Sequence, residues 1–201
     1  MTPQGLAHAV PDADDATVIR LSRHEPEHFT ELFRRHAPHI QRYVVRRLGT
    51  DAADDIVAET FLLAFRQRDR YDLAHADARP WLYGIATNLI GRHRRAEIRL
   101  YRALARTGAD PVCEPFTDRV DDRVSAGHAS RQLAAALARL PAELRDTILL
   151  AAWGDLSYVQ IAVALGVPIG TVRSRLSRAR TKLRQTMGDT DPSALTEEPQ
   201  K

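Results

Sequence analysis

The chain has 201 residues, of which 44% are hydrophobic and 27% charged, a globular composition that excludes a largely disordered protein. The formal net charge is only +3, so the distribution of charge says more about partners than its total. Cys113 is the only cysteine, which excludes an internal disulfide, and no apolar run reaches the length of a membrane span. These features, with no signal-peptide pattern at the N-terminus, predict a cytoplasmic protein without membrane insertion.

Helical periodicity dominates the first part of the chain, and no segment shows convincing strand alternation. Residues 1–13 are predicted to form a disordered arm. A short helix is expected over residues 14–22, and a longer one follows over residues 29–48. Pro38 lies inside the second pattern and should kink or break that helix, because proline has no amide hydrogen to donate.

A third helix is expected from residue 51, with Thr50 or Asp51 as its cap. A polar loop over residues 69–79 follows, and Pro80 is predicted to start one long helix that runs to about Leu104. The second half of that helix is strongly basic. Its arginines are Arg92, Arg94, Arg95, Arg99, Arg102 and Arg106. Residues 14–106 are therefore predicted to form a first helical domain.

Residues 107–129 are rich in acidic residues, proline and glycine, which predicts a flexible acidic linker. A second helical domain is expected over residues 130–187, beginning with one helix over 131–140 and another that opens at Pro141. The acidic tail, residues 188–201, is predicted to be disordered. The expected fold class is all-α, with two small helical domains and a helix-turn-helix in the second.

The helix-turn-helix is predicted from residues 157–184. Ser157 can cap a first short helix, Gly166 suits the left-handed conformation that ends it, and Pro168 can open a second helix. Apolar side chains fall on one side of the second helix: Val172, Leu176, Ala179 and Leu183. Its other side carries Ser174, Ser177, Arg178 and Thr181, flanked by Arg173 and Arg184.

This second helix has the profile of one that enters the DNA major groove, where arginine contacts guanine edges and phosphates and serine serves as either donor or acceptor. No acidic residue occurs between Leu156 and Gly188, so its basic side chains are uncompensated locally. A solvated basic helix on an ordinary bundle is the alternative. The agreement of motif geometry and charge favours a DNA-binding helix.

Residues 140–180, LPAELRDTILLAAWGDLSYVQIAVALGVPIGTVRSRLSRAR, closely resemble region four of bacterial extracytoplasmic-function (ECF) sigma factors of the sigma-70 family. The segments AADDIVAETFLLAF and RPWLYGIATNLIGRHRR, within residues 52–95, resemble region two. The resemblance implies a sigma factor that binds core RNA polymerase and promoter DNA. Region two would recognise and melt the minus-ten element, and region four would bind the minus-thirty-five duplex. It also implies that an anti-sigma factor can hold the chain.

The resemblance also assigns roles to residues. Asp54, Asp55 and Glu59 fall where the family contacts polymerase, whereas the sequence alone supports only a favourable interaction with the helix dipole. The positions implied for minus-ten binding and melting are Tyr83, Asn88, Arg92, Arg94 and Arg95. Trp81 and Tyr83 could stack on bases, or both could be core residues. The positions implied for minus-thirty-five binding are Thr171, Arg173, Ser174, Ser177 and Arg178.

Two other classes of protein compete with this interpretation. A plain transcription regulator would carry a receiver or ligand-binding domain before its helix-turn-helix, where this chain has an arginine-rich helical domain. An enzyme would need a catalytic or metal-binding constellation. The histidine pairs His24 with His28 and His36 with His39 lack further ligands and are expected to lie on the surface. We therefore expect no catalytic residue, metal or cofactor.

Overall fold

The computed structural model describes residues 13–107 and 120–187, with side chains described from residue 130 onward in the second range. All regular elements within these ranges are helical, which confirms the all-α fold class. The expected arm, tail and lone cysteine (residues 1–12, 188–201 and Cys113) lie outside the described residues.

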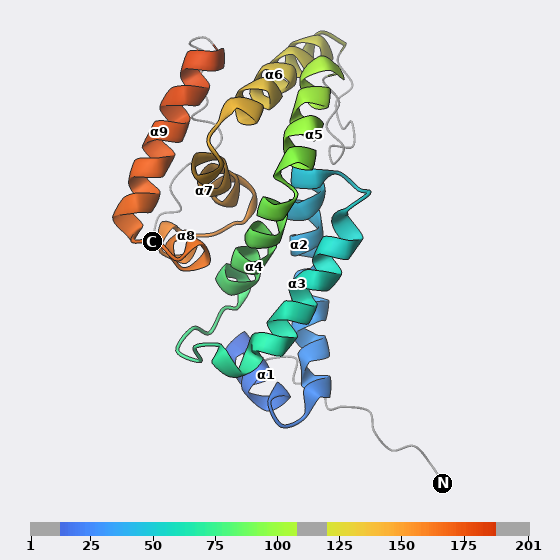
Figure 1. Cartoon of the computed structure of the whole chain (residues 1–201), viewed down its shortest axis with the longest axis vertical. Coiled ribbons are helices and arrows are strands. Elements are labelled where there is room, and N and C mark those ends of the chain that lie inside the picture. The colour runs from blue at the N-terminus through green and yellow to red at the C-terminus, as the bar shows by residue number, and fades with distance from the viewer. Residues whose placement is uncertain (1–12, 108–119, 188–201) are drawn as a thin grey trace.

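The first part of the chain forms helices α1 to α5, drawn from blue to green in Figure 1. Their bounds are α1 Asp15–Ser22, α2 Phe29–Leu48, α3 Ala53–Gln67, α4 Arg79–Arg92 and α5 Arg94–Thr107, with short 3-10 helices at η1 Pro26–His28 and η2 Arg68–Arg70. Helices α2, α3 and α4 pack on one another around an apolar core. Leu32, Ile40 and Val44 of α2 are fully buried in that core, as the apolar spacing of this helix requires.

The second part of the chain forms helices α6 to α9, drawn from yellow to red in Figure 1. Their bounds are α6 Val120–Arg139, α7 Ala142–Trp153, α8 Tyr158–Leu165 and α9 Ile169–Met187. Helix α9 packs on α7, α6 and α8. In α7, the expected inward residues Leu144, Ile148 and Leu149 are buried.

Four helix boundaries differ from expectation. Helix α2 runs unbroken through Pro38, which lies on its exposed side, where water can satisfy the carbonyl that proline leaves without a donor. Helix α3 begins at Ala53 with no side-chain cap, so the expected cap at Thr50 or Asp51 is wrong. The long helix expected from Pro80 is divided at His93 into α4 and α5.

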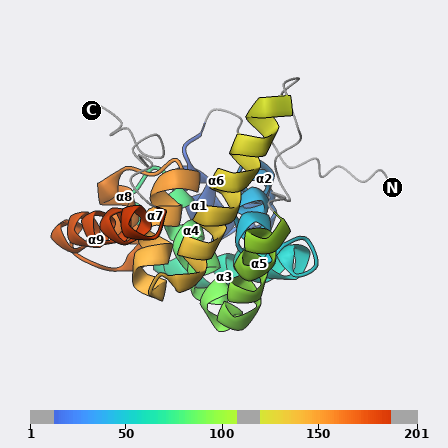
Figure 2. The ribbon, with the colours of Figure 1, turned by 90° about the horizontal axis from the view of Figure 1, so that it is seen from above.

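Helix α6 is the fourth difference, because it begins at Val120 and not near Arg131. It packs along α5 of the first part of the chain, and the two helices form one end of the molecule in Figure 1. Seen from above in Figure 2, α4 lies among α2, α3 and the second group of helices. Helix α4 contacts both α7 and α8, so the two helical domains pack directly against each other.

Candidate nucleic-acid interface

The helix-turn-helix forms as the sequence indicates. The Ser157 hydroxyl accepts a hydrogen bond from the Gln160 backbone N–H at 3.3 Å, and the Ser157 backbone N–H donates to Gln160 Oε1 at 2.9 Å. This reciprocal capping box fixes the start of α8. Gly166 ends α8 with φ +62°, the left-handed conformation that favours glycine. The expected cap and turn are both confirmed.

Helix α9 has one buried side and one exposed polar side. Its buried side chains are Val172, Leu176, Ala179 and Leu183, as expected. Of the five residues expected to bind the minus-thirty-five element, Thr171 is partly exposed. The other four are exposed: Arg173, Ser174, Ser177 and Arg178. The Ser174 hydroxyl donates to the Thr171 carbonyl at 3.0 Å, and Arg178 Nε donates to the Ser174 carbonyl at 3.3 Å. These hydrogen bonds hold hydroxyl and guanidinium groups close together on the exposed side of α9.

A second polar surface lies along α4 and the start of α5. Asn88, Arg92, Arg94 and Arg95 are exposed there. Tyr83 differs, because it is only 2% exposed and its ring packs edge-on against Tyr43 at 5.1 Å. Burial raises the pKa of Tyr83 to about 12. This burial contradicts the expectation that Tyr83 stacks on DNA bases, and its ring belongs to the core.

The loop before α4 and one face of α4 line a groove next to Asn88. One hollow of about 370 Å³ is lined by Tyr71, His75, Trp81 and Asn88 among others. The ring centroids of Tyr71 and Trp81 lie 4.9 Å apart with the ring planes tilted by 50°, and Trp81 is partly exposed. The Tyr71 hydroxyl donates to the His75 carbonyl at 2.7 Å, which holds the loop in shape. An aromatic surface with an adjacent amide can hold an unstacked base.

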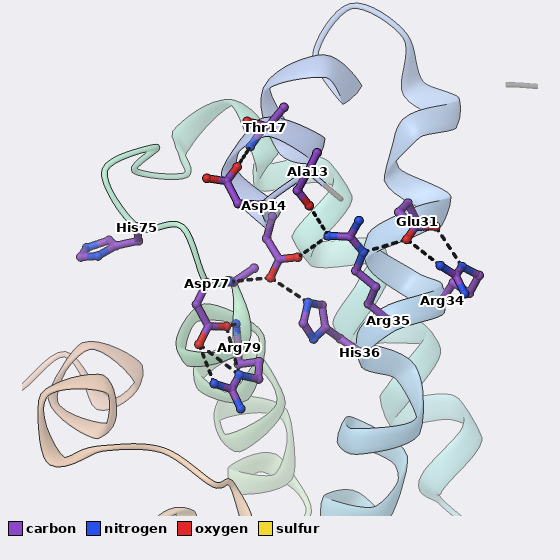
Figure 3. Close-up of polar contacts among 12 residues, drawn as sticks. Ala13, Asp14, Thr17, Glu31, Arg34, Arg35, His36, His75, Asp77 and Arg79 are labelled. Atoms are coloured by element: carbon purple, nitrogen blue, oxygen red, sulfur yellow. Dashed lines mark hydrogen bonds and ion pairs between the residues drawn. The ribbon is translucent and has the colours of Figure 1, made fainter. Parts of the chain in front are cut away.

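A buried polar cluster joins this loop to helices α1 and α2 (Figure 3). Asp15 accepts hydrogen bonds from His36 Nε2 at 2.8 Å and from the Ala78 backbone N–H at 2.9 Å, and it also pairs with Arg35 at 3.3 Å. Burial alone would raise the pKa of Asp15, but the His36 and Ala78 hydrogen bonds outweigh it and lower that pKa. His36 is buried, so the expectation that it is a surface histidine is wrong.

Another candidate surface lies on α2 and α3. Asp54 and Asp55 are exposed, and Glu59 is half-exposed and pairs with Arg92 at 3.3 Å. Phe33 and Leu62 are large apolar side chains with 45% and 47% exposure. Neither side chain was assigned a role from the sequence. The signal that could have found them is a helix with more apolar residues than its buried side needs.

A shallow hollow of about 390 Å³ connects the acidic and apolar parts of this surface. Its lining is Phe33, Ala37, Pro38, Gln41, Asp54, Val57 and Ala58. Gln41 Nε2 donates to Asp54 Oδ1 at 2.8 Å, which orients the carboxylate beside the exposed ring of Phe33. An exposed apolar patch rimmed by polar groups is typical of a protein-binding surface.

No three histidine, cysteine or acidic side chains gather as metal ligands within the described residues. None of the helices in the described part of the chain combines the length and apolar character that a membrane crossing needs. The site geometry therefore consists of a basic helix-turn-helix, a second basic surface beside an aromatic groove, and an acidic and apolar surface. These features define a DNA-binding protein with a protein-binding surface.

Comparisons with known proteins agree with this class. The Sigma-70 region 2 family model matches residues 32–107, and the Sigma-70, region 4 model matches residues 130–183. The chain is 36% identical over 159 residues to ECF RNA polymerase sigma factor SigE of Mycolicibacterium smegmatis, covering 77% of this chain and 59% of that protein. It is 35% identical over 158 residues to ECF RNA polymerase sigma factor SigC of Mycobacterium tuberculosis, covering 78% of this chain and 80% of that protein.

Solved structures share the fold. CnrH, in complex with the cytosolic domain of CnrY, has a TM-score of 0.60 at 22% identity, covering 88% of this chain and 99% of that chain. RpoE of Bartonella quintana, in complex with the anti-sigma factor NepR, has a TM-score of 0.54 at 23% identity. The match covers 79% of this chain and 95% of that chain.

The chain therefore belongs to the sigma-70 family, among its ECF sigma factors. It is a transcription-initiation factor that binds core RNA polymerase and recognises promoter DNA, and it is not an enzyme.

Proposed function

We propose that the two domains divide promoter recognition between them. Residues 14–106 act as region two, which binds core polymerase and then recognises and melts the minus-ten element. Residues 130–187 act as region four, which binds the minus-thirty-five element as duplex, and residues 107–129 link the two. The segments 1–13 and 188–201 flank these units as an arm and a tail.

The observation that carries this proposal is the exposed side of α9. Arg173, Ser174, Ser177 and Arg178 are exposed, and the opposite side of the helix is buried. The Ser174 and Arg178 contacts hold donors on the side that would face the major groove. Thr171 lies near the start of the same helix, where residues of a recognition helix reach base edges.

For the minus-ten element, the proposal uses Asn88, Arg92, Arg94 and Arg95. All four side chains are exposed on consecutive helices, and the three arginines make a cationic track beside the groove at Trp81. Phosphates of a displaced strand would bind the arginines, and an unstacked base would bind at Trp81. Tyr83 takes no part, because it is buried.

Polymerase binding is proposed for the surface of Asp54, Asp55 and Glu59. The carboxylates complement a basic partner surface, and the exposed side chains of Phe33 and Leu62 supply the apolar area that a stable interface needs. Because RNA polymerase works there, we place the protein in the cytoplasm. An anti-sigma factor is a further proposed partner, supported by RpoE, which was solved with NepR.

Permanganate footprinting tests the role of the cationic track in melting. The double variant Arg94→Ala and Arg95→Ala should reduce thymine reactivity at the minus-ten element by roughly fivefold to tenfold, because two phosphate contacts are lost. Duplex binding at the minus-thirty-five element should persist. Arg20→Ala, which removes an exposed arginine from α1, is the matched control and should melt normally. Equal melting by all variants would contradict the proposed track.

A further inference from the structure

Two hollows adjoin next to Trp81, where the two domains meet. The first, of about 280 Å³, is lined by the loop before α4 and by residues of α8. The second, of about 370 Å³, continues along α4 to Asn88 and reaches Arg70 of η2. Ligand pockets commonly have volumes of about 300–1,000 Å³ and often lie between domains, so the two hollows together can hold a small organic molecule. Four residues line both hollows: Tyr71, His75, Trp81 and Val163.

Helix α8 forms one wall of these hollows, and close packing on α4 fixes its position. A Cβ atom at Gly84 would lie 2.5 Å from the Ala164 carbonyl oxygen, so the two helices approach to a distance that only glycine permits. Gln160 Nε2 donates to Asp77 Oδ2 at 2.8 Å, which joins the first turn of α8 to the loop before α4. The wall is therefore in place before any ligand binds.

Apolar groups from both domains line the first hollow. Trp81 of α4 is partly exposed, and its ring centroid lies 4.9 Å from that of Tyr71. Val159 and Val163 of α8 are 60% and 44% exposed. A flat ring in this hollow would remove apolar surface of both helices from water. An aromatic ring would gain more than a saturated one, because aromatic pairs attract each other beyond the area that they bury.

The charged groups that line the hollows differ in whether they already have a partner. Asp77 pairs with Arg79 at 2.9 Å, and Asp72 lies 3.7 Å from His75 Nε2. Arg70 is exposed and forms no ion pair with any residue that the structure describes. A guanidinium group can bind a carboxylate through two parallel hydrogen bonds. The charge left to be paired in the hollows is therefore positive, which favours an anionic ligand.

We propose that the two hollows form a binding site for a small planar aromatic carboxylate. Its ring lies against Trp81 and the valines of α8, and its carboxylate binds Arg70. The inference rests on the proposed function in one respect, because Trp81 also belongs to the groove proposed to hold an unstacked minus-ten base. The carboxylate and that base exclude each other, so the ligand lowers transcription.

NMR of the free, isotope-labelled protein tests the site, with naphthoate as the probe. The chain has two tryptophans, Trp81 and Trp153, so its spectrum contains two indole N–H peaks, which Trp153→Phe assigns. The Trp81 peak should shift on titration. The Trp153 peak should not, because Trp153 lines a separate hollow of only about 60 Å³. A Trp81 peak that stays in place at millimolar naphthoate would overturn the inference.

Two analogues separate the contribution of the ring from that of the charge. Naphthamide keeps the ring and has no charge, and it should bind roughly tenfold more weakly, because a hydrogen bond to a charged group is lost. Decalin carboxylate keeps the charge and has no aromatic ring, and it should bind roughly threefold to tenfold more weakly. Equal binding of all three compounds would overturn the assigned class of ligand.

Arg70→Gln tests the carboxylate contact within the protein. The change should lower the affinity for naphthoate by roughly tenfold and leave the affinity for naphthamide unchanged. Arg66→Gln is the matched control, because Arg66 is an exposed arginine that lines neither hollow, and it should bind naphthoate as the wild type does. Equal affinities of the two variants for naphthoate would contradict the role of Arg70.

Run-off transcription with core polymerase tests the competition. At a naphthoate concentration of about ten times its Kd, the yield should fall by roughly tenfold with the wild type and by roughly half with Arg70→Gln. Naphthoate that shifts the Trp81 peak without changing the yield would overturn the competition with the minus-ten base. No transcription in the absence of naphthoate would instead contradict the proposed function, and the NMR titration would still test the binding site.

Discussion

The buried carboxylate of Asp15 holds the loop that lines the aromatic groove, although Asp15 itself does not line that groove. It connects α1, α2 and the loop before α4 through His36, Arg35 and the Ala78 backbone N–H (Figure 3). The loop in turn carries Tyr71 and His75, which line the aromatic groove. The shape of the groove therefore depends on a residue behind it.

This cluster predicts a pH-dependent contribution to stability. The pKa of Asp15 in the folded protein lies below its ordinary value of 3.8, so its contribution is present above about pH 4 and is lost as the pH falls through the lowered pKa. Asp15→Asn should cost about 1–3 kcal/mol at pH 7 and progressively less below pH 4, as measured by urea unfolding.

Asp14→Asn is the matched control for this change. Asp14 is exposed and caps α1 by accepting from the Thr17 backbone N–H at 2.8 Å, and asparagine caps about as well as aspartate. A cost for Asp15→Asn that stays constant down to pH 2.5 would contradict the ionised form of Asp15 as the source of stability.

Arg173 is the residue with the sharpest prediction on α9. Arg173→Ala should weaken binding to minus-thirty-five duplex by about 1–3 kcal/mol if the side chain makes a bidentate contact to a base, and binding to core polymerase should not change. Fluorescence anisotropy on duplex and on core polymerase measures both affinities. Arg20→Ala removes the same charge from α1 and is the control. Loss of both activities would indicate a misfolded variant.

At the scale of elements, three features that depend on neighbouring residues in the sequence were predicted correctly. The Ser157 cap, the Gly166 turn and the buried side of α9 follow from side-chain periodicity and backbone preference, and all three are confirmed. The unbroken α2 was not predicted, because the sequence around Pro38 does not show that this proline lies on the exposed side of the helix, where water can satisfy the freed carbonyl. The break at His93 was not predicted either.

The position of α8 on α4 depends on contacts far apart in sequence. Nothing near Gly84 indicates that Ala164 will lie against it. One signal was available, since YVQIAVAL is apolar on more than one side of the helix, which predicts a second packing surface without identifying its partner. Burial of Tyr83 and His36 was likewise decided by neighbours from other helices, Tyr43 and Asp15.

The turn of the helix-turn-helix gives a prediction at this scale. Gly166→Val should destabilise the second domain by about 1–2 kcal/mol, because a β-branched residue resists a φ of +62°. Gly170→Val is the matched control, since Gly170 lies in α9 without a positive φ and with no atom within 4 Å of an added Cβ. Thermal unfolding compares the two variants. Equal melting temperatures would show that the left-handed turn is not required.

At the scale of the whole molecule, three separate surfaces are proposed to bind three different partners. The exposed side of α9 is proposed for duplex DNA, the track beginning at Arg92 for the melted strand, and the surface around Asp54 for polymerase. Residues of all three surfaces are exposed, and they lie on different helices of the chain.

Run-off transcription tests the central claim most directly. Purified core polymerase is supplied with genomic promoter fragments, with and without this protein. We expect new transcription starts that require both the protein and core polymerase, and the DNA upstream of these starts should share two elements at a constant spacing. No new starts, together with tight binding of promoter duplex by the protein alone, would contradict the account and indicate a plain DNA-binding regulator.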